Sequence, residues 1–262
     1  MSHPSQRALA TTRLGLALLL AVQGIAGEQS RIGPAPKPAP KPFRVGERLE
    51  YQIGWSNFLT AATATLLVLE QRTFEGRPAW HLRARSSTVG GVRFIYELDD
   101  QYDSYSDVST LESLQYEQFQ RHEKRNEQKT VRMGSDPAQG PAGSHIGRVP
   151  SSTRDPLGAY YWLRTIDWDS VGEASTQVYD GTTRYEMRAR VVVSEEMARV
   201  PAGNFRATKI EVRMFEQGSE LTDTRFWLWL AKDGKRTPVL VEATLPFGTL
   251  QVELKSATQV AH

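Results

Sequence analysis

Histidine and carboxylate side chains are the groups in this sequence that could do metal or acid–base chemistry. Beyond residue 26 the histidines are His81, His122, His145 and His262. No two have the four-residue spacing of helical zinc ligands, and no His-Glu-x-x-His, Gly-x-Ser-x-Gly or Gly-x-x-x-x-Gly-Lys motif occurs. Cysteine is absent, which excludes thiolate chemistry. We therefore predict no metal site and no cofactor, and the sequence nominates no catalytic residue.

Two clusters of charged residues could form a catalytic or ligand-binding site. The acidic cluster contains Asp99, Asp100, Asp103 and Asp107. Carboxylates can bind calcium or form an acid/base pair, but this spacing does not match an EF-hand loop, so we interpret the cluster as a solvated turn and edge strand. The basic stretch over residues 121–132 could touch anionic lipid headgroups. Acidic residues interrupt it, which favours a solvated hairpin tip.

Aromatic residues give a stronger lead than the charged ones. Ordinary core packing accounts for most of them individually, but together they indicate an apolar ligand pocket beneath a curled sheet. The candidate pocket residues are Trp55, Trp80, Phe94, Tyr96, Tyr160, Tyr161, Trp227 and Trp229.

Short alternating strands must position these side chains. In Pro78–Ser86, Trp80 and Leu82 share one face, while His81 and Arg83 share the other, which we expect to be solvated. Val92–Leu98 is expected to be another strand. About ten such segments predict a mainly β fold: a large curled antiparallel sheet or half-barrel with one short helix packed against it.

The one predicted helix runs from Pro156 to Ile166. Asp155 is a favourable N-cap and proline suits the first helical position. The Gly- and Pro-rich stretch Gly134–Thr153 before it predicts a flexible loop. After the helix, Asp180-Gly181 is a strong hairpin dipeptide. Phe226–Leu230 is apolar on both faces, so that strand should be buried on both sides.

The N-terminal residues predict export. Residues 1–26 have the basic, apolar and small-residue regions of a Sec-type signal peptide, and the apolar run Leu14–Val22 is too short to cross a bilayer. Residues 27–42 form a Pro-rich linker, and residues 43–258 a single antiparallel β domain. Without residues 1–26 the acidic and basic residues balance, which argues against nucleic-acid binding. The lack of cysteine excludes a lipoprotein.

Five sequence segments, in this order along the chain, resemble those of a known family: Phe43–Tyr51, Asp155–Arg164, Val200–Phe205, Asp233–Val239 and Pro246–Leu250. They are similar to the bacterial exported family "domain of unknown function 3108", from about Phe43 to Lys255. The resemblance implies an envelope-located β domain and carries over no catalytic residue. The likeness to half-barrel periplasmic lipid or lipoprotein carriers is an analogy of fold.

The sequence thus favours a periplasmic or envelope protein that binds a hydrophobic ligand, either a lipid, an acyl chain or an extended peptide, without catalysis. We expect no transmembrane span in the mature protein. One alternative is an assembly partner in envelope biogenesis that accepts a strand from an envelope protein. The other is a carboxylate-dependent hydrolase of envelope polymers, which requires two inward carboxylates in one cleft.

Overall fold

The computed structural model describes residues 40–55, 58–123, 125–134, 149–222, 224–245 and 248–259. The predicted signal peptide (1–26) and nearly all of the predicted linker (27–42) lie outside the described residues, as does 135–148, the middle of the predicted Gly134–Thr153 loop.

Antiparallel strands dominate the described chain. The first half contains β1 (Glu47–Trp55), β2 (Phe58–Phe74), β3 (Arg77–Thr88), β4 (Leu98–Asp107), β5 (Ser113–His122) and β6 (Arg125–Arg132), with the short helix α2 (Gly90–Ile95) between β3 and β4. After the helix α3 (Pro156–Thr165) come β7 (Glu173–Tyr179), β8 (Arg184–Val200), β9 (Gly203–Glu216), β10 (Ser219–Glu220), β11 (Arg225–Ala231), β12 (Pro238–Leu245) and β13 (Gly248–Gln259).

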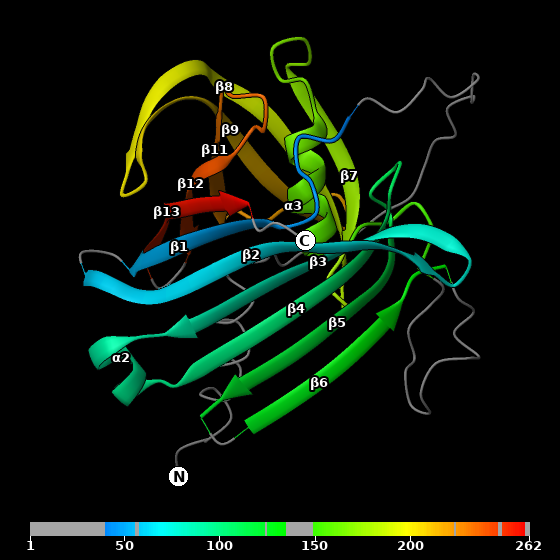
Figure 1. The fold of residues 1–262 in the computed structure, drawn as a ribbon, viewed down its shortest axis with the longest axis horizontal. Coiled ribbons are helices and arrows are strands. Elements are labelled where there is room, and N and C mark those ends of the chain that lie inside the picture. Colours follow the sequence, from blue (N-terminus) through cyan, green and yellow to red (C-terminus); the bar gives the residue numbers. More distant parts are fainter. Residues whose placement is uncertain are drawn as a thin grey trace.

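All these strands form one 13-stranded sheet, in the order β6-β5-β4-β3-β2-β1-β13-β12-β11-β9-β8-β7 with β10 beside β9. The sheet curls around α3, and its hydrogen-bonded ladder ends at β6 and β7 rather than closing (Figure 1). The prediction of a curled antiparallel sheet with a helix against it is confirmed. Alternation sets which face lies inside the curl: Leu49, Tyr51 and Ile53 of β1 are buried, while the residues between them are only half-buried.

The gap between the two end strands is bridged by the segment that leads into α3. On one side, the backbone N–H of Ser113 on β5 donates to the carbonyl of Thr153 at 3.0 Å. On the other side, Arg154 forms a parallel bridge with Val178 of β7. Apolar contacts between Val131, Val149 and Tyr179 complete the join. The segment before α3 therefore connects the two ends of the sheet, which strand pairing does not join.

The strand β11 is buried on both faces, as its apolar sequence predicted. Leu228 and Leu230 face the inside of the curl, whereas Trp229 lies in a different cluster with Ala198 of β8. The long β8–β9 hairpin reaches the outward-facing Trp229, which donates its indole N–H to Glu196 of β8. Near the tip of the hairpin, the N–H of Ala202 donates to the carbonyl of Leu254 on β13 at 2.9 Å. The hairpin thus shields the outer surface of the sheet.

The predicted helix is confirmed and the strand predicted at Val92–Leu98 is wrong. Residues 90–95 form α2, and β4 begins only at Leu98. Gly90 has φ +54°, a left-handed conformation that glycine adopts freely and that ends β3. Strong β-propensity in the segment is thus overridden by this turn. Among the described residues, no helix is long and apolar enough to span a membrane.

Candidate functional site

The inside of the curled sheet contains an apolar cavity of about 100 Å³ that is partly open to solvent. Alternate residues of the strands form much of its wall, because side chains at every second position point to the same face. They include Leu66 of β2, Ala84 of β3, Leu228 of β11, Val241 and Ala243 of β12, and Leu250 of β13.

The other wall of the cavity is α3, through Leu157, Tyr160 and Leu163. The helix begins where it does because the Asp155 side chain accepts the backbone N–H of Gly158 at 2.8 Å. The hydroxyls of Ser104 and Ser113 also donate to this carboxylate. Burial raises the pKa of Asp155, and these hydrogen bonds oppose that shift. The cap therefore ties the start of the helix to β4 and β5.

Two tyrosine hydroxyls provide polar groups beside the cavity. The Tyr51 hydroxyl donates to the carbonyl of Pro238 at 2.9 Å, so its oxygen is free to accept a hydrogen bond from Tyr160. Burial raises the pKa of Tyr160 to about 12. Both residues line the cavity, which therefore offers neutral hydroxyls in an otherwise aliphatic surface.

A buried ion pair anchors the other end of α3. The guanidinium of Arg164 donates to both carboxylate oxygens of Glu47, at 2.6 and 3.0 Å, and also to the carbonyl of Lys235. Its cation lies 5.3 Å from the ring centre of Phe43 and 5.2 Å from that of Tyr161. Since Glu47 opens β1, this pair fixes α3 across one end of the curl.

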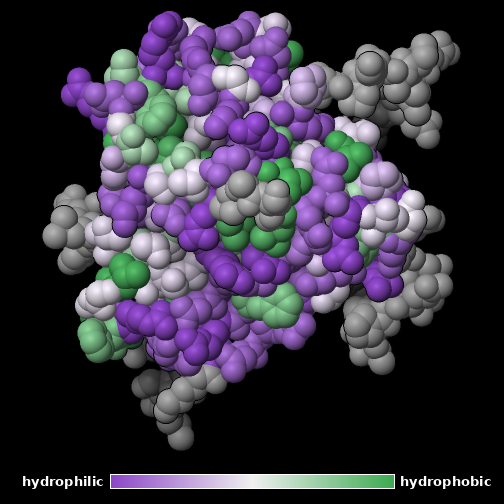
Figure 2. Space-filling model, viewed as in Figure 1, coloured by the Kyte–Doolittle hydropathy of each residue, from purple (hydrophilic) through white to green (hydrophobic). Residues whose placement is uncertain are grey.

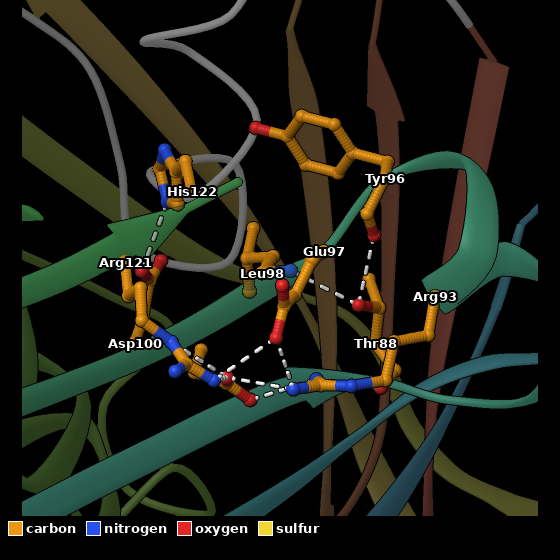
Figure 3. Close-up of polar contacts among 9 residues, drawn as sticks. Thr88, Arg93, Tyr96, Glu97, Leu98, Asp100, Arg121 and His122 are labelled. Carbon is orange, nitrogen blue, oxygen red and sulfur yellow. Dashed lines mark hydrogen bonds and ion pairs between the residues drawn. The ribbon is translucent and has the colours of Figure 1, made fainter. Parts of the chain in front are cut away.

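The interior surface beside β4 and β5 is polar. Asp100 is buried and accepts hydrogen bonds from Tyr102 at 3.0 Å and from His122 at 2.9 Å, as Figure 3 shows for the histidine. The bond to Asp100 raises the pKa of His122, although burial opposes it. Gln120 donates to Tyr102 and completes the network. The interior is therefore apolar towards β11–β13 and hydrogen-bonded towards β4 and β5.

The sequence family described as "Protein of unknown function (DUF3108)" matches residues 50–255. The chain belongs to this family. No curated protein matches the sequence. Among solved structures, a β-barrel-like protein of the unknown-function family DUF1849 from Brucella abortus is similar, with a TM-score of 0.52 and 10% identity over 83% of this chain and 99% of that one.

Two further solved structures resemble this DUF3108 chain less closely. One is a proposed exported protein with a YmcC-like fold from Bacteroides fragilis, at TM-score 0.39 and 10% identity over 82% of this chain and 97% of that one. The other is a proposed lipoprotein from Parabacteroides distasonis, at TM-score 0.37 and 11% identity over 82% and 96%. At these identities the Brucella structure supports the barrel-like fold and nothing finer.

The aromatic residues predicted for a pocket are spread over several parts of the DUF3108 fold. Tyr160 lines the cavity. Trp227 is also among its lining residues, but its ring points to the same face of β11 as that of Trp229, 5.9 Å from the Lys209 ammonium. Trp80 and Tyr161 lie beside it in a core cluster, in edge-on contact with Phe43. Trp55 is half-buried at the end of β1, in register with Leu250.

The other three candidates lie away from the cavity wall. Trp229 faces outward and donates its indole N–H to Glu196, with Lys209 4.5 Å above its ring. Tyr96 ends α2, and Phe94 on that helix is 95% exposed. Most of the actual lining is aliphatic. Its signal in the sequence is two-residue alternation, as in Val241 and Ala243 of β12 and in Leu250 and Val252 of β13.

The charged clusters are also better ordered than the sequence indicated. His81 is buried rather than solvated, 2.6 Å from Asp103 and stacked on Tyr105. The acidic cluster is no edge, because β4 lies between β3 and β5, and Asp100 and Asp103 are both buried. Among the described residues, no group of three or more potential ligands could hold a metal ion.

Proposed function

We propose that this DUF3108 protein is exported to the cell envelope and binds the acyl chain of a lipid or fatty acid inside its curled sheet. The supporting observation is the apolar cavity between α3 and the concave face of the sheet. Its volume is below the roughly 150 Å³ of an engineered cavity that takes up benzene. Because the cavity is partly open to solvent, it can hold part of a slender acyl chain without enclosing the whole ligand.

The chemistry around the cavity suits an amphiphile. Ser86 of β3 is a polar lining residue, together with Tyr51 and Tyr160. The Arg85 side chain is exposed on the opposite face of β3, where it donates to Gln101. The hydroxyls there can donate hydrogen bonds to a carboxylate or phosphate head, while the aliphatic wall holds the chain. None of the described residues that line the cavity carries a carboxylate. The alternative of a carboxylate-dependent hydrolase therefore has no support at this cavity.

The alternative of strand addition is less well supported. Among the described strands, the end strand β6 pairs with β5 alone, but Arg125, Glu127 and Lys129 alternate along it. Charged side chains on an edge strand are a common device against pairing with another chain.

Dodecanoate provides the direct test, by native mass spectrometry and titration calorimetry. We expect one bound molecule per chain. Val241→Trp fills the cavity and should weaken binding by about tenfold or more, since each displaced methylene costs about 0.8 kcal/mol. Leu240→Trp is the matched control, because Leu240 is the adjacent half-buried residue and does not line the cavity.

Circular dichroism of both variants checks that each retains the fold. If Val241→Trp is unstable, the smaller change Ala243→Leu fills the same space and carries the test. Equal dodecanoate affinity in the cavity variants and in Leu240→Trp would refute the proposed site. An absence of binding to the wild-type protein would refute the proposal itself.

A further inference from the structure

The short helix α2 carries the two most exposed large apolar side chains found in the described part of the chain. Phe94 is 95% exposed and Ile95 84% exposed, and they are adjacent in sequence. Figure 2 shows hydrophobic atoms at the edge of a largely hydrophilic face, at the place where Figure 1 draws α2. Contiguous exposed apolar surface is typical of sites that bind proteins or membranes.

The helix is held firmly at its base. Arg93 makes a bidentate contact with Asp99, at 2.9 Å to each oxygen, and a further one with Glu97 at 2.8 Å. Arg121 of β5 pairs with the same two carboxylates (Figure 3). The Thr88 hydroxyl donates to Tyr96 and accepts the N–H of Leu98. The exposed pair is therefore presented on an ordered support.

The support is also electrically balanced, because two arginines face two carboxylates. A strongly charged partner would gain little from such a cluster, whereas a zwitterionic surface meets no net charge. Because these charges are paired with each other, the apolar side chains of Phe94 and Ile95 are the groups through which α2 would bind a partner.

The exposed apolar area of α2 favours a lipid surface over a protein as its partner. A buried aromatic residue covers roughly 150–250 Å², whereas a stable protein interface needs roughly 800 Å² from each side. Two side chains fall far short of that area. A bilayer needs no shape complementarity, and amphipathic elements bind it by placing a few apolar side chains at the boundary between headgroups and acyl chains.

The position of α2 fits this use. It connects the end of β3 to the start of β4, a few residues beyond Ser86 at the cavity. The inner helix lies towards the other ends of these strands, since Asp155 contacts Ser104 near the end of β4 and Ser113 at the start of β5. Contact with a bilayer through α2 would bring the end of the curl opposite the start of α3 close to lipid.

We propose that Phe94 and Ile95 on α2 dock this protein onto the surface of a zwitterionic phospholipid bilayer. This inference does not depend on the proposed cavity ligand, because docking needs only the exposed pair and its support.

The lack of cysteine allows a site-specific test in the purified protein. A single Phe94→Cys, labelled with the environment-sensitive fluorophore NBD, reports the polarity around α2 when phosphatidylcholine vesicles are added. We expect a blue shift and increased emission. Met197→Cys carries the control label, since Met197 is an exposed apolar residue, at 54%, on β8. An equal response at the two positions, or none at Phe94→Cys, would overturn the proposal.

Vesicle flotation tests the apolar side chains themselves. The double variant Phe94→Ser/Ile95→Ser should reduce partitioning onto phosphatidylcholine vesicles by about tenfold or more. The control Val171→Ser/Met197→Ser removes exposed apolar residues elsewhere and should leave partitioning unchanged. Unchanged partitioning in the α2 double variant would refute docking through this helix.

Two other outcomes would assign α2 a different occupant. A dimer in analytical ultracentrifugation that is lost in the α2 double variant would show that the pair binds a second copy. Loss of dodecanoate affinity in that variant, with no vesicle binding by wild type, would show a lid over the cavity. Vesicle binding without dodecanoate binding would retain docking and refute only the cavity proposal.

Discussion

Arg164 is a residue whose role depends entirely on its partner. It is fully buried, and its charge is matched by Glu47 from a strand 117 residues away in sequence. Nothing local in the sequence indicates this pair, because each residue looks like an ordinary surface charge. A buried ion pair is weak evidence for net stability, yet losing one partner leaves an uncompensated charge in the core.

We therefore expect Arg164→Met to lower the free energy of unfolding by about 3–5 kcal/mol, measured by urea titration. The double variant Glu47→Gln/Arg164→Met removes both charges and should recover part of that loss. As a control, Arg206→Met breaks the exposed pair with Glu195 and should change stability little. A similar loss of unfolding free energy in Arg164→Met and Arg206→Met would show that burial of the Arg164–Glu47 pair does not determine its effect on stability.

His122 gives a prediction about pH. Asp100 stabilises its protonated form, so its pKa in the folded state lies above the ordinary value of 6.5. The stabilisation is fully present below pH 6.5 and is lost as the pH rises through the folded pKa. NMR titration of the His122 ring should show this elevated pKa, and Asp100→Asn should lower it. An identical titration in the two proteins would contradict the pairing.

At the scale of elements, the sequence predicted what local chemistry controls. The Asp155-Pro156 start of α3 was recognised because capping involves residues three positions apart. The helix α2 was missed because its stability comes from Arg93 bonding to Asp99 and from a glycine turn, which compete with a segment of high β-propensity. Buried polar residues such as His81 and Asp103 were misread because their partners lie on neighbouring strands.

The two helices contain glycines in their first turns that should respond oppositely to alanine. A Cβ at Gly158 would lie 3.0 Å from the Ser106 hydroxyl and 3.1 Å from that of Ser113, whereas one at Gly91 meets open space. Alanine normally stabilises a helix by about 0.5–1 kcal/mol relative to glycine. We expect this gain for Gly91→Ala and a loss for Gly158→Ala in thermal unfolding. A gain at both positions would show that α3 can move away from β4.

For the whole molecule, alternation and turn residues predicted an antiparallel curl, because they set which face of each strand is buried. They could not predict how the ends of the sheet meet. That join depends on Gln118 of β5, whose side-chain amide donates to the carbonyl of Asp180, and on the bridge formed by Arg154. Both are contacts between distant segments. The sequence therefore indicated an interior without determining whether the curl encloses it.

The turn after β7 offers a test of how far enclosure depends on this join. Gly181 has φ +94°, and a Cβ there would lie 2.8 Å from the Gln118 amide nitrogen and 3.0 Å from Val131 on β6. Gly76 has a similar φ of +79° but open space around it. Alanine in a left-handed conformation costs about 1–2 kcal/mol at either position. Crowding against the opposite end of the sheet should add about 1–3 kcal/mol at Gly181 alone.

We thus expect Gly181→Ala to lose more stability than Gly76→Ala in urea unfolding, and to increase hydrogen–deuterium exchange in β6 and β7. Exchange in the central strands β1 and β13 should stay unchanged, since their hydrogen bonds are to each other and to their neighbours. An equal loss of stability in the two alanine variants would mean that the two ends of the sheet can move apart without a loss of stability. The cavity would then be enclosed by α3 and the continuous strands alone.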